Sequence, residues 1–290
     1  MKKVLLASSI LALSAGFAAA EGVEVSGSAR MGLVYDSPSG DTVFSSRVRI
    51  VFTASGETDG GLSFGAEMRA DQNGGNADGT ANGDSTVFIS GAFGRLTMGD
   101  VSGAADALVG QVSGVGYGPI DALQEIDFVS TTKTAAYYEY SAGAFTFGLG
   151  AGQTDSGNDE ANIGVKYSAG GYSAALAYED SDAEDLLSLG GSAEFGPATV
   201  KARVSDSDIA DKDTTWALSV DYVTGPATIT AFYTDFGNTT LASPDTQHVG
   251  LGVAYDLGGG ATLAGGVVQQ LNDDGVDDET FADVGLKFSF

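Results

Sequence analysis

The chain has 290 residues, no cysteine and a formal net charge of −26 at pH 7. This length allows one large domain or two small ones. The shortage of lysine and arginine argues against nucleic-acid binding, which requires clustered basic side chains. Solvated acidic loops are the simplest explanation of the charge. After the first twenty residues, no apolar run approaches the about 18 residues of a membrane-spanning helix.

The N-terminal segment has the pattern of a secretion signal. Met1-Lys2-Lys3 is a basic start, residues 4–17 are rich in leucine and alanine, and three small residues at 18–20 precede Glu21. We therefore expect residues 1–20 to be a signal peptide that is removed, and residues 21–290 to form a single domain. An N-terminal anchor helix is the alternative, but the stretch is short and no charged stop follows it.

From Val23 onward the sequence alternates between apolar and polar residues. In the segment 23–35, Val23, Val25, Met31 and Leu33 share one parity, and polar side chains occupy most of the other positions. This period of two is typical of strands with one apolar and one wet face. Similar runs recur to the C-terminus and amount to about sixteen strands, whereas no segment has the period of an amphipathic helix.

The connections between the predicted strands fall into two classes that alternate along the chain. The short ones are rich in glycine and proline: 55–61, 92–94, 141–144, 168–171, 196–198, 224–227 and 256–261. The long ones are acidic and polar: 36–42, 71–85, 100–133, 152–160, 179–185, 205–213, 235–247 and 270–280. This alternation is what sixteen antiparallel strands require when both chain ends lie on the side of the short turns.

Aromatic residues on the apolar face decide between a membrane barrel and a soluble sandwich. One row lies next to the short turns or the C-terminus: Tyr140, Tyr167, Phe195, Tyr222, Tyr255 and Phe290. Another lies next to long connections: Tyr35, Tyr178 and Tyr233. Two aromatic rows at the two ends of the strands match the girdles of a membrane barrel. The sequence therefore predicts an all-β, 16-stranded antiparallel transmembrane β-barrel.

Three segments resemble the general (non-specific) porins of Gram-negative bacteria, particularly the alphaproteobacterial type. They are 23–30 (VEVSGSAR), 91–100 (GAFGRLTMGD) and 282–290 (ADVGLKFSF, with a terminal phenylalanine). The resemblance covers the whole mature chain. It implies a multi-pass barrel in the outer membrane, a water-filled channel for passive diffusion of ions and small hydrophilic solutes, and a homotrimer. It also implies contact with outer-membrane lipid and lipopolysaccharide, no required cofactor and no enzymatic activity.

In porins the third loop is long and folds into the barrel, where it narrows the pore. The third long connection here, 100–133, is the longest in the chain, and its acidic residues are Asp100, Asp106, Asp121, Glu125 and Asp127. The resemblance therefore implies that this loop folds inward and forms an acidic side of the constriction.

Five arginines lie on the wet face of the first five predicted strands: Arg30, Arg47, Arg49, Arg69 and Arg95. In a barrel the wet face lines the lumen, so they should form a basic wall. Our hypothesis is that the acidic loop faces this wall across the constriction, which would set ion preference. The acidic chain predicts mild cation selectivity. The alternative is that carboxylates such as Glu24 and Glu67 neutralise ordinary lumen arginines, which suits Arg95 best.

Other functions receive little support from the sequence. Residues 61–65 match G-x-S-x-G, but Ser63 lies in an alternating strand with no helix after it, and the sole histidine, His248, has only Asp245 nearby. A structural or adhesive barrel without an open channel would have the same strands. Small residues at lumen positions argue for open space instead: Ser26, Ser28, Gly65, Gly148, Gly150, Gly164, Gly190 and Gly285.

Calcium binding is a further hypothesis. Oxygen ligands for a hard cation gather at Asp273, Asp274, Asp277 and Asp278, and again at Asp206, Asp208, Asp211 and Asp213. Neither group has EF-hand spacing, so solvated external loops are the simpler interpretation. We expect a structural Ca²⁺ only as an optional ligand, which could bridge loop carboxylates to lipopolysaccharide.

Overall fold

The computed structural model describes residues 20–36, 39–73, 85–129, 135–152, 159–237, 245–272 and 276–290. Within these ranges the chain forms sixteen strands and one short helix. Their bounds are β1 (Ala20–Asp36), β2 (Asp41–Glu57), β3 (Ser63–Asn73), β4 (Ser85–Gly91), β5 (Gly94–Gly99), α1 (Ala104–Leu108), β6 (Ala135–Ala142), β7 (Phe145–Ala151), β8 (Glu160–Ala169), β9 (Tyr172–Ser181), β10 (Leu186–Phe195), β11 (Ala198–Ser207), β12 (Thr215–Thr224), β13 (Ala227–Asp235), β14 (Thr246–Gly258), β15 (Ala261–Asn272) and β16 (Glu279–Ser289). The predicted signal peptide lies outside the described residues except for Ala20, which begins β1.

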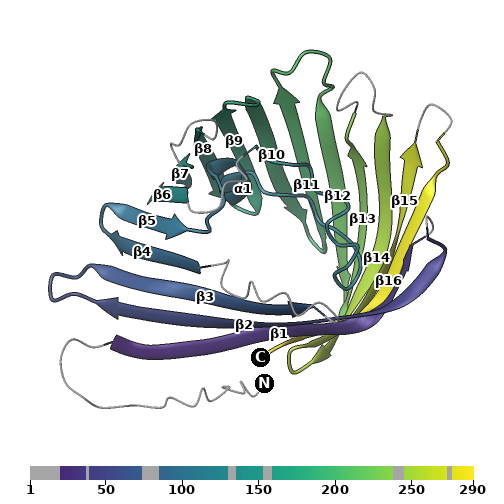
Figure 1. The fold of residues 1–290 in the computed structure, drawn as a ribbon, viewed down its shortest axis with the longest axis horizontal. Coiled ribbons are helices and arrows are strands. Elements are labelled where there is room, and N and C mark those ends of the chain that lie inside the picture. The colour runs from purple at the N-terminus through teal and green to yellow at the C-terminus, as the bar shows by residue number, and fades with distance from the viewer. Residues whose placement is uncertain are drawn as a thin grey trace.

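The strands close into a barrel. Each strand pairs antiparallel with its neighbours in sequence, and β1 pairs with both β2 and β16, as Figure 1 shows. The last residue continues the seam: the Phe290 N–H donates to the Gly27 carbonyl at 3.0 Å, and the Gly27 N–H donates to the Phe290 carbonyl at 2.7 Å. The predicted 16-stranded antiparallel barrel is confirmed. Among the described residues, no helix is long and apolar enough to cross a membrane.

The alternation in the sequence becomes an apolar outer surface and a polar inner one. On β14 the inward residues His248, Gly250 and Gly252 are buried, whereas the outward Leu251 is 59% exposed and its neighbours Val249 and Val253 are also exposed. A soluble sheet packed on a core shows the reverse, with polar side chains outside. A barrel that exposes an apolar band outward is suited to contact with lipid acyl chains.

The short turns have the chemistry that tight hairpins require. β10 and β11 are joined by Gly196-Pro197, and β12 and β13 by Gly225-Pro226. The φ angles of Gly196 and Gly225 are +61° and +58°, which only glycine adopts without strain, and the following proline fixes its own φ near −65°. Glycine at the first central position favours the turn twist that matches paired strands.

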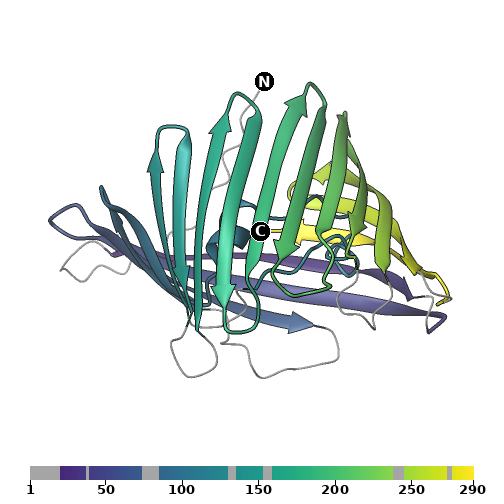
Figure 2. The same ribbon diagram turned by 90° about the horizontal axis from the view of Figure 1, so that it is seen from above.

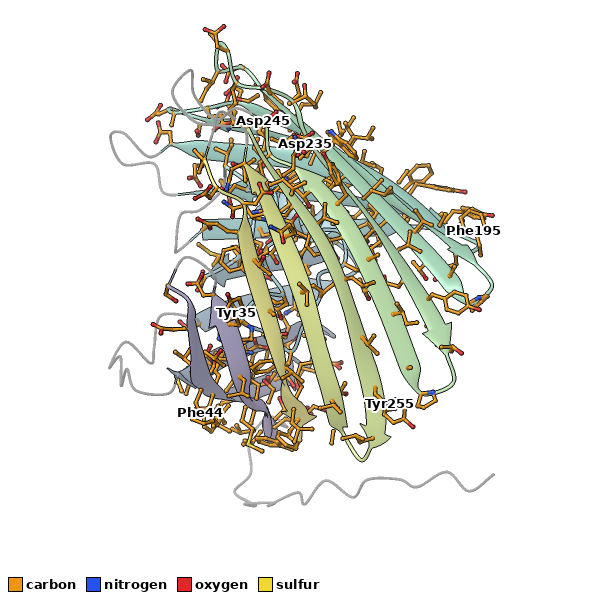
Figure 3. The ribbon with its side chains drawn as sticks, turned by 90° about the vertical axis from the view of Figure 1, so that its right-hand side faces the viewer. Tyr35, Phe44, Phe195, Asp235, Asp245 and Tyr255 are labelled. Atoms are coloured by element: carbon orange, nitrogen blue, oxygen red, sulfur yellow. The ribbon has the colours of Figure 1, made fainter. Side chains whose placement is uncertain are left out.

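Aromatic side chains lie at both ends of the outer surface. Figure 3 shows Phe195 and Tyr255 at one end of the strands, and Asp235 and Asp245 at the opposite end. Near the latter end, the rings of Trp216 and Tyr233 are 4.9 Å apart. Amphipathic aromatic rings are favoured at the level of lipid headgroups, so these rows mark the two membrane interfaces.

The wall of the barrel is not equally high all round. β1 and β2 each have 17 residues, whereas β4, β5, β6 and β7 have 7, 6, 8 and 7 residues within the described ranges. Figure 2 shows β1–β3 strongly inclined to the strands β8–β12. A strand that crosses the hydrocarbon core of a bilayer needs about 9–11 residues, so the wall around β4–β7 is low.

The single tryptophan of the chain, Trp216, tests the orientation of the wall. It is the second residue of β12, 39% exposed and outward-facing. In liposomes, we expect lipids brominated near the headgroup to quench its fluorescence more than lipids brominated near the chain ends. Efficient quenching by aqueous iodide without quenching by any brominated lipid would contradict an outward Trp216 at the interface.

Candidate functional site

After β5 the chain turns into the barrel instead of out to solvent. Residues 100–129, which we call loop 3, carry α1, and α1 packs on the inner side of β7, β8 and β9 (Figure 1). The inward folding implied by the resemblance is therefore confirmed. Because loop 3 occupies part of the cross-section, it narrows the aqueous passage between itself and the opposite wall.

Glycines on the inner wall provide room for loop 3. A Cβ at Gly148 or Gly164 would lie 2.9 or 3.0 Å from Cδ1 of Leu108, and one at Gly190 would lie 2.7 Å from Cγ1 of Val109. These separations are shorter than ordinary carbon contacts. The interpretation of these three glycines as open lumen is wrong: they form the seat on which α1 and its following residue rest.

Apolar side chains of loop 3 form the core of the protein. Val115 and Ile120 pack with Phe232 and Val268 of the wall, and Val112 and Ile126 pack with Ala217. Tyr117 is fully buried, and its ring lies against Gly32 and Gly285 of β1 and β16. Burying a large apolar side chain contributes about 1.5–3 kcal/mol, so the loop is held by packing along most of its length.

Hydrogen bonds fix the first half of loop 3 to the wall. The Ala104 N–H donates to Oδ1 of Asn162 at 2.7 Å, and the Ser113 N–H donates to Oγ of Ser219 at 2.9 Å. The Tyr117 N–H meets both carboxylate oxygens of Asp283 at 3.1 Å. These wall groups satisfy loop amides that would otherwise be buried without partners.

Wall side chains also hold the returning half of the loop. Arg203 of β11 donates to the carbonyls of Ile126 at 2.7 Å and Asp127 at 3.1 Å, and its guanidinium lies 3.7 Å from the centre of the Phe128 ring. Glu179 of β9 accepts from the Val129 N–H at 3.4 Å. Sequence reasoning missed these anchors. The alternating pattern predicts that the side chains of Arg203 and Glu179 face the lumen, but it does not predict their partners on loop 3.

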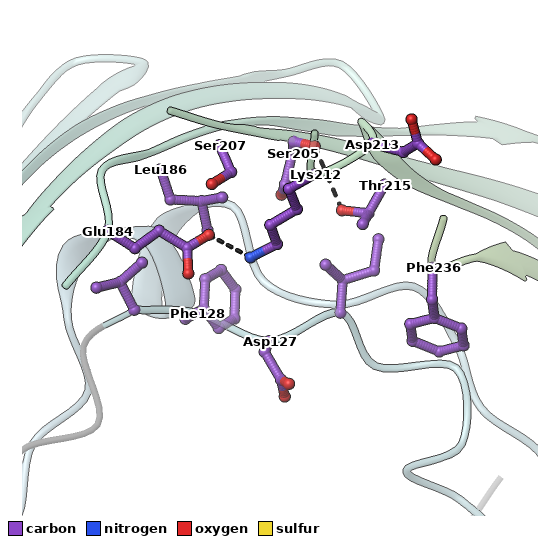
Figure 4. Close-up of a pocket in the computed structure, with 12 residues that line it drawn as sticks. Asp127, Phe128, Glu184, Leu186, Ser205, Ser207, Lys212, Asp213, Thr215 and Phe236 are labelled. Carbon is purple, nitrogen blue, oxygen red and sulfur yellow. Dashed lines mark hydrogen bonds and ion pairs between the residues drawn. The ribbon is translucent and has the colours of Figure 1, made fainter. Parts of the chain in front are cut away.

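A pocket lies between this half of the loop and strands β10–β12 (Figure 4). Its volume is about 90 Å³, and Phe128, Leu186 and Phe236 contribute apolar surface to it. An ion pair between Lys212 and Glu184 also lines it. The ion pair joins the connections that follow β9 and β11 and thereby stiffens the wall beside loop 3.

Three basic side chains form a row on the wall that faces loop 3. The strand register places Lys287 of β16 opposite Arg30 of β1, and Arg30 opposite Arg47 of β2. Arg30 reaches the loop, because a Cβ at Gly118 would lie 1.9 Å from its Nη1. Within the described part of the chain, the buried Nε atoms of Arg30 and Arg47 have no hydrogen-bond partner. Sequence analysis identified Arg30 and Arg47 but not Lys287.

The remaining predicted arginines have different surroundings. Asp71 of β3 pairs with Nη2 of Arg49 at 2.8 Å and with Nε of Arg69 at 3.2 Å. Asp71 is therefore a carboxylate that compensates part of these two charges, and it is not one of the predicted partners Glu24 and Glu67. Arg95 stacks over the Phe88 ring at 3.7 Å, next to the short β4–β5 turn.

Of the acidic residues in loop 3, Asp121 lies nearest the basic row. Its enclosed position within the barrel raises its pKa through partial loss of hydration, and the charges of Arg30, Lys287 and Arg47 act in the opposite direction. The pKa of Glu125 is also raised, first by loss of hydration and then by the negative charges of Asp121, Asp106 and Asp127.

Asp106 and Asp127 both act electrostatically on Arg203. Asp100 stands at the start of the loop, where its N–H donates to the Ser85 carbonyl at 2.9 Å. The charges of Arg30, Lys287 and Arg47 thus act on Asp121, whereas Asp100 contacts the Ser85 carbonyl and Arg95 contacts the Phe88 ring.

The geometry of a barrel narrowed by an inward loop agrees with comparisons to known proteins. The profile of the family described as Gram-negative porin matches residues 7–275. The porin of Rhodobacter capsulatus is 34% identical over 92% of this chain and 100% of its own length. The chain belongs to the Gram-negative porin family.

Other porins support the same assignment. The porin of Fuscovulum blasticum is 28% identical, with 92% of this chain and all of the relative covered. A porin structure refined at 1.8 Å resolution matches with a TM-score of 0.77 at 33% identity, over 93% of this chain and 100% of that one. A substituted variant of the Rhodopseudomonas blastica porin matches with a TM-score of 0.78 at 26% identity and the same coverage.

This porin is therefore a multi-pass β-barrel of the Gram-negative outer membrane that provides a channel for ions and small hydrophilic solutes. Its relatives are channels, and a barrel without an open lumen is not favoured. Ser63 begins β3, and the next element is the antiparallel strand β4, so the local structure is not the strand–turn–helix of a nucleophile elbow.

The predicted calcium ligands are only partly described. Asp273 and Asp274 lie outside the described residues, Asp278 accepts from the Asn272 N–H at 3.1 Å, and Asp277 contributes its backbone carbonyl to Asn272. In the second group, Asp206 and Asp208 accept from Thr214 and from the Asp185 N–H. Among the described residues, no group of three acidic or histidine side chains could hold a metal ion. Calcium binding stays a prediction, which calorimetric titration after dialysis against EDTA would test.

The burial of Tyr117 predicts its importance for stability. Replacing it in Tyr117→Ala leaves a cavity between loop 3 and the glycines of β1 and β16, and should lower the free energy of unfolding by about 3 kcal/mol. Urea unfolding in detergent micelles measures this change. The matched control is Tyr172→Ala, because Tyr172 is 55% exposed on the outer surface. Equal losses in the two variants would contradict the packing role of Tyr117.

Proposed function

We propose that this porin is mildly cation-selective and that a transverse electric field at the constriction controls passage. The carrying observation is that Asp121 of loop 3 lies opposite the row formed by Lys287, Arg30 and Arg47. Opposite charges on two sides of a narrow aqueous passage align water and dipolar solutes, and the balance of the charges sets the ion preference.

The balance at the constriction favours cations for two reasons. Arg49 and Arg69 share Asp71, so part of the basic wall is compensated locally. Loop 3 adds Asp106, Glu125 and Asp127 to Asp121, and the whole chain carries a net charge of −26. A negative field at the mouth and along the loop raises the local concentration of cations.

Neutralising charges on the two sides should have opposite effects. In Asp121→Asn/Glu125→Gln the K⁺/Cl⁻ permeability ratio should fall, and in Arg47→Gln it should rise. In water, one charge about 8 Å from the ion path changes the energies of K⁺ and Cl⁻ by about 0.5 kcal/mol in opposite directions, which together give roughly a fivefold change in the ratio. Reversal potentials in a KCl gradient across a planar bilayer measure the effect. Arg95→Gln is the matched control, and an effect of Arg95→Gln as large as that of Arg47→Gln would refute the assignment.

The selectivity should also depend on pH. Because the pKa values of Asp121 and Glu125 are raised, these groups bind protons at a higher pH than ordinary carboxylates do. They are ionised above their raised pKa values, where cation preference is greatest, and they lose their charge as the pH falls through those values. A reversal-potential series between pH 8 and pH 3 should show the decline beginning above the ordinary aspartate range near 4. The decline should disappear in Asp121→Asn/Glu125→Gln and persist in Asp182→Asn.

We propose that the low wall at β4–β7 faces other copies of the chain in a homotrimer, and that the remaining outer surface contacts lipid and lipopolysaccharide. The low wall carries exposed apolar side chains, including Val87 and Met98, and β5, with 6 residues, is shorter than a strand that spans the hydrocarbon layer. A protein neighbour would remove the mismatch. A cysteine at Val87 should form a cross-link between copies in outer membranes, whereas one at Leu251 on β14 should not. The reverse pattern would overturn this placement.

A further inference from the structure

His248 is the only histidine of the chain, and it stands where loop 3 meets the wall of the barrel. It belongs to β14 and is 7% exposed. Its ring faces the Phe236 ring edge-on, with centroids 4.8 Å apart and planes at 71°. Loop 3 reaches it at Leu123, two residues from both Asp121 and Glu125.

A chain of four polar contacts passes through the ring. Nδ1 of His248 contacts the Leu123 carbonyl oxygen, and Nε2 lies 2.9 Å from Oε1 of Gln270. Nε2 of Gln270 lies 3.0 Å from Oδ1 of Asn272, and Nδ2 of Asn272 lies 2.9 Å from the Asp277 carbonyl oxygen. Backbone carbonyls, which only accept, therefore stand at both ends of the chain.

The two end carbonyls determine the direction of every bond between them. Asn272 must present its NH₂ group to the Asp277 carbonyl, so its oxygen faces Gln270. Gln270 must then donate to that oxygen with its own NH₂ group, which turns its oxygen toward His248. Reversing either amide would place two oxygens or two NH₂ groups face to face. Nε2 of His248 consequently meets an acceptor, and Nδ1 meets another in the Leu123 carbonyl.

A neutral imidazole has one N–H and cannot donate from both nitrogens, whereas an imidazolium can. We propose that His248 is a positively charged imidazolium in the folded channel, and that in this state it fastens loop 3 at Leu123 and positions Asp121 and Glu125 at the constriction. Loss of the second proton turns one of the four contacts into a repulsion between lone pairs. His248 is thus a positioning residue for the channel.

Several titratable groups belong to the elements around the ring. Loop 3 contributes Asp121 and Glu125 on either side of Leu123, and Asp235 precedes Phe236. Glu279 of β16 is opposite Gln270 in register, Asp245 precedes β14, and Asp278 follows Asn272 at the next connection. All of these groups are acidic. The two atoms that the ring nitrogens contact are oxygens of uncharged groups.

The presence of a single histidine makes the charge state directly measurable. In channels labelled with ¹⁵N-histidine, we expect both ring nitrogens to give the resonances of protonated nitrogens at about pH 7. Asn272→Ala removes the group that orients Gln270, whose amide can then turn and donate to Nε2. In that variant one ring nitrogen should give the resonance of an unprotonated nitrogen at the same pH. Wild-type channels with one unprotonated ring nitrogen at pH 7 would overturn the proposal.

Single-channel recording tests the positioning role. Wild-type current should be steady near pH 7, because the ring holds loop 3 at Leu123. His248→Gln, whose single NH₂ group cannot reach both the Leu123 carbonyl and Gln270, should show added fluctuations and altered selectivity at the same pH, whereas Asp182→Asn should behave as the wild type does. A current in His248→Gln as steady as that of the wild type would refute the role of the ring. The recording rests on the proposed function, in which loop 3 forms the constriction. The resonance measurement does not depend on it, so a failure of the His248 proposal can be told from a failure of the constriction proposal.

Discussion

The closure of the sheet between β1 and β16 is the constraint on which the rest of the molecule depends. Lipid offers no hydrogen bonds to backbone groups, so a membrane-spanning sheet must have no free edge. The register that joins Gly32 to Gly285 also joins Arg30 to Lys287 and, through β1, to Arg47. The same pairing therefore satisfies the backbone, forms the glycine surface under Tyr117 and builds the basic row of the lumen.

Loop 3 replaces the apolar centre that a soluble domain would have. Most apolar side chains of the strands face outward, and the buried apolar clusters lie between the loop and the few apolar residues of the inner wall. Glycines under Leu108 and Val109 let the helix approach the strands, and Asn162, Ser219 and Asp283 bind loop amides. A loop held in this way can present charges at a fixed distance from the opposite wall.

The charged groups of the lumen divide into compensated and available ones. Asp71 compensates part of the charge of Arg49 and Arg69, and Arg203 is occupied with carbonyls of loop 3. Lys287, Arg30 and Arg47 lie opposite Asp121, where their charge acts across water. In our proposal His248 adds a third kind of charge, one that holds the loop by hydrogen bonds instead of acting on the solute.

The sequence by itself determined the barrel, because a period of two, two classes of connection and two aromatic rows are local properties of a strand and its ends. Chemistry and parity also singled out Arg30 and Arg47, and the family resemblance implied an acidic inward loop that contains Asp121. Only the tertiary structure assigned their partners. Lys287, Arg203 and His248 are far in sequence from the groups they face, and Asp71 is 22 residues from Arg49. The role of Gly148, Gly164 and Gly190 becomes visible only when α1 and Val109 lie against them. The alternating pattern predicts whether a side chain faces the lumen or the outer surface. Strand register and the path of loop 3 determine which residues that side chain contacts.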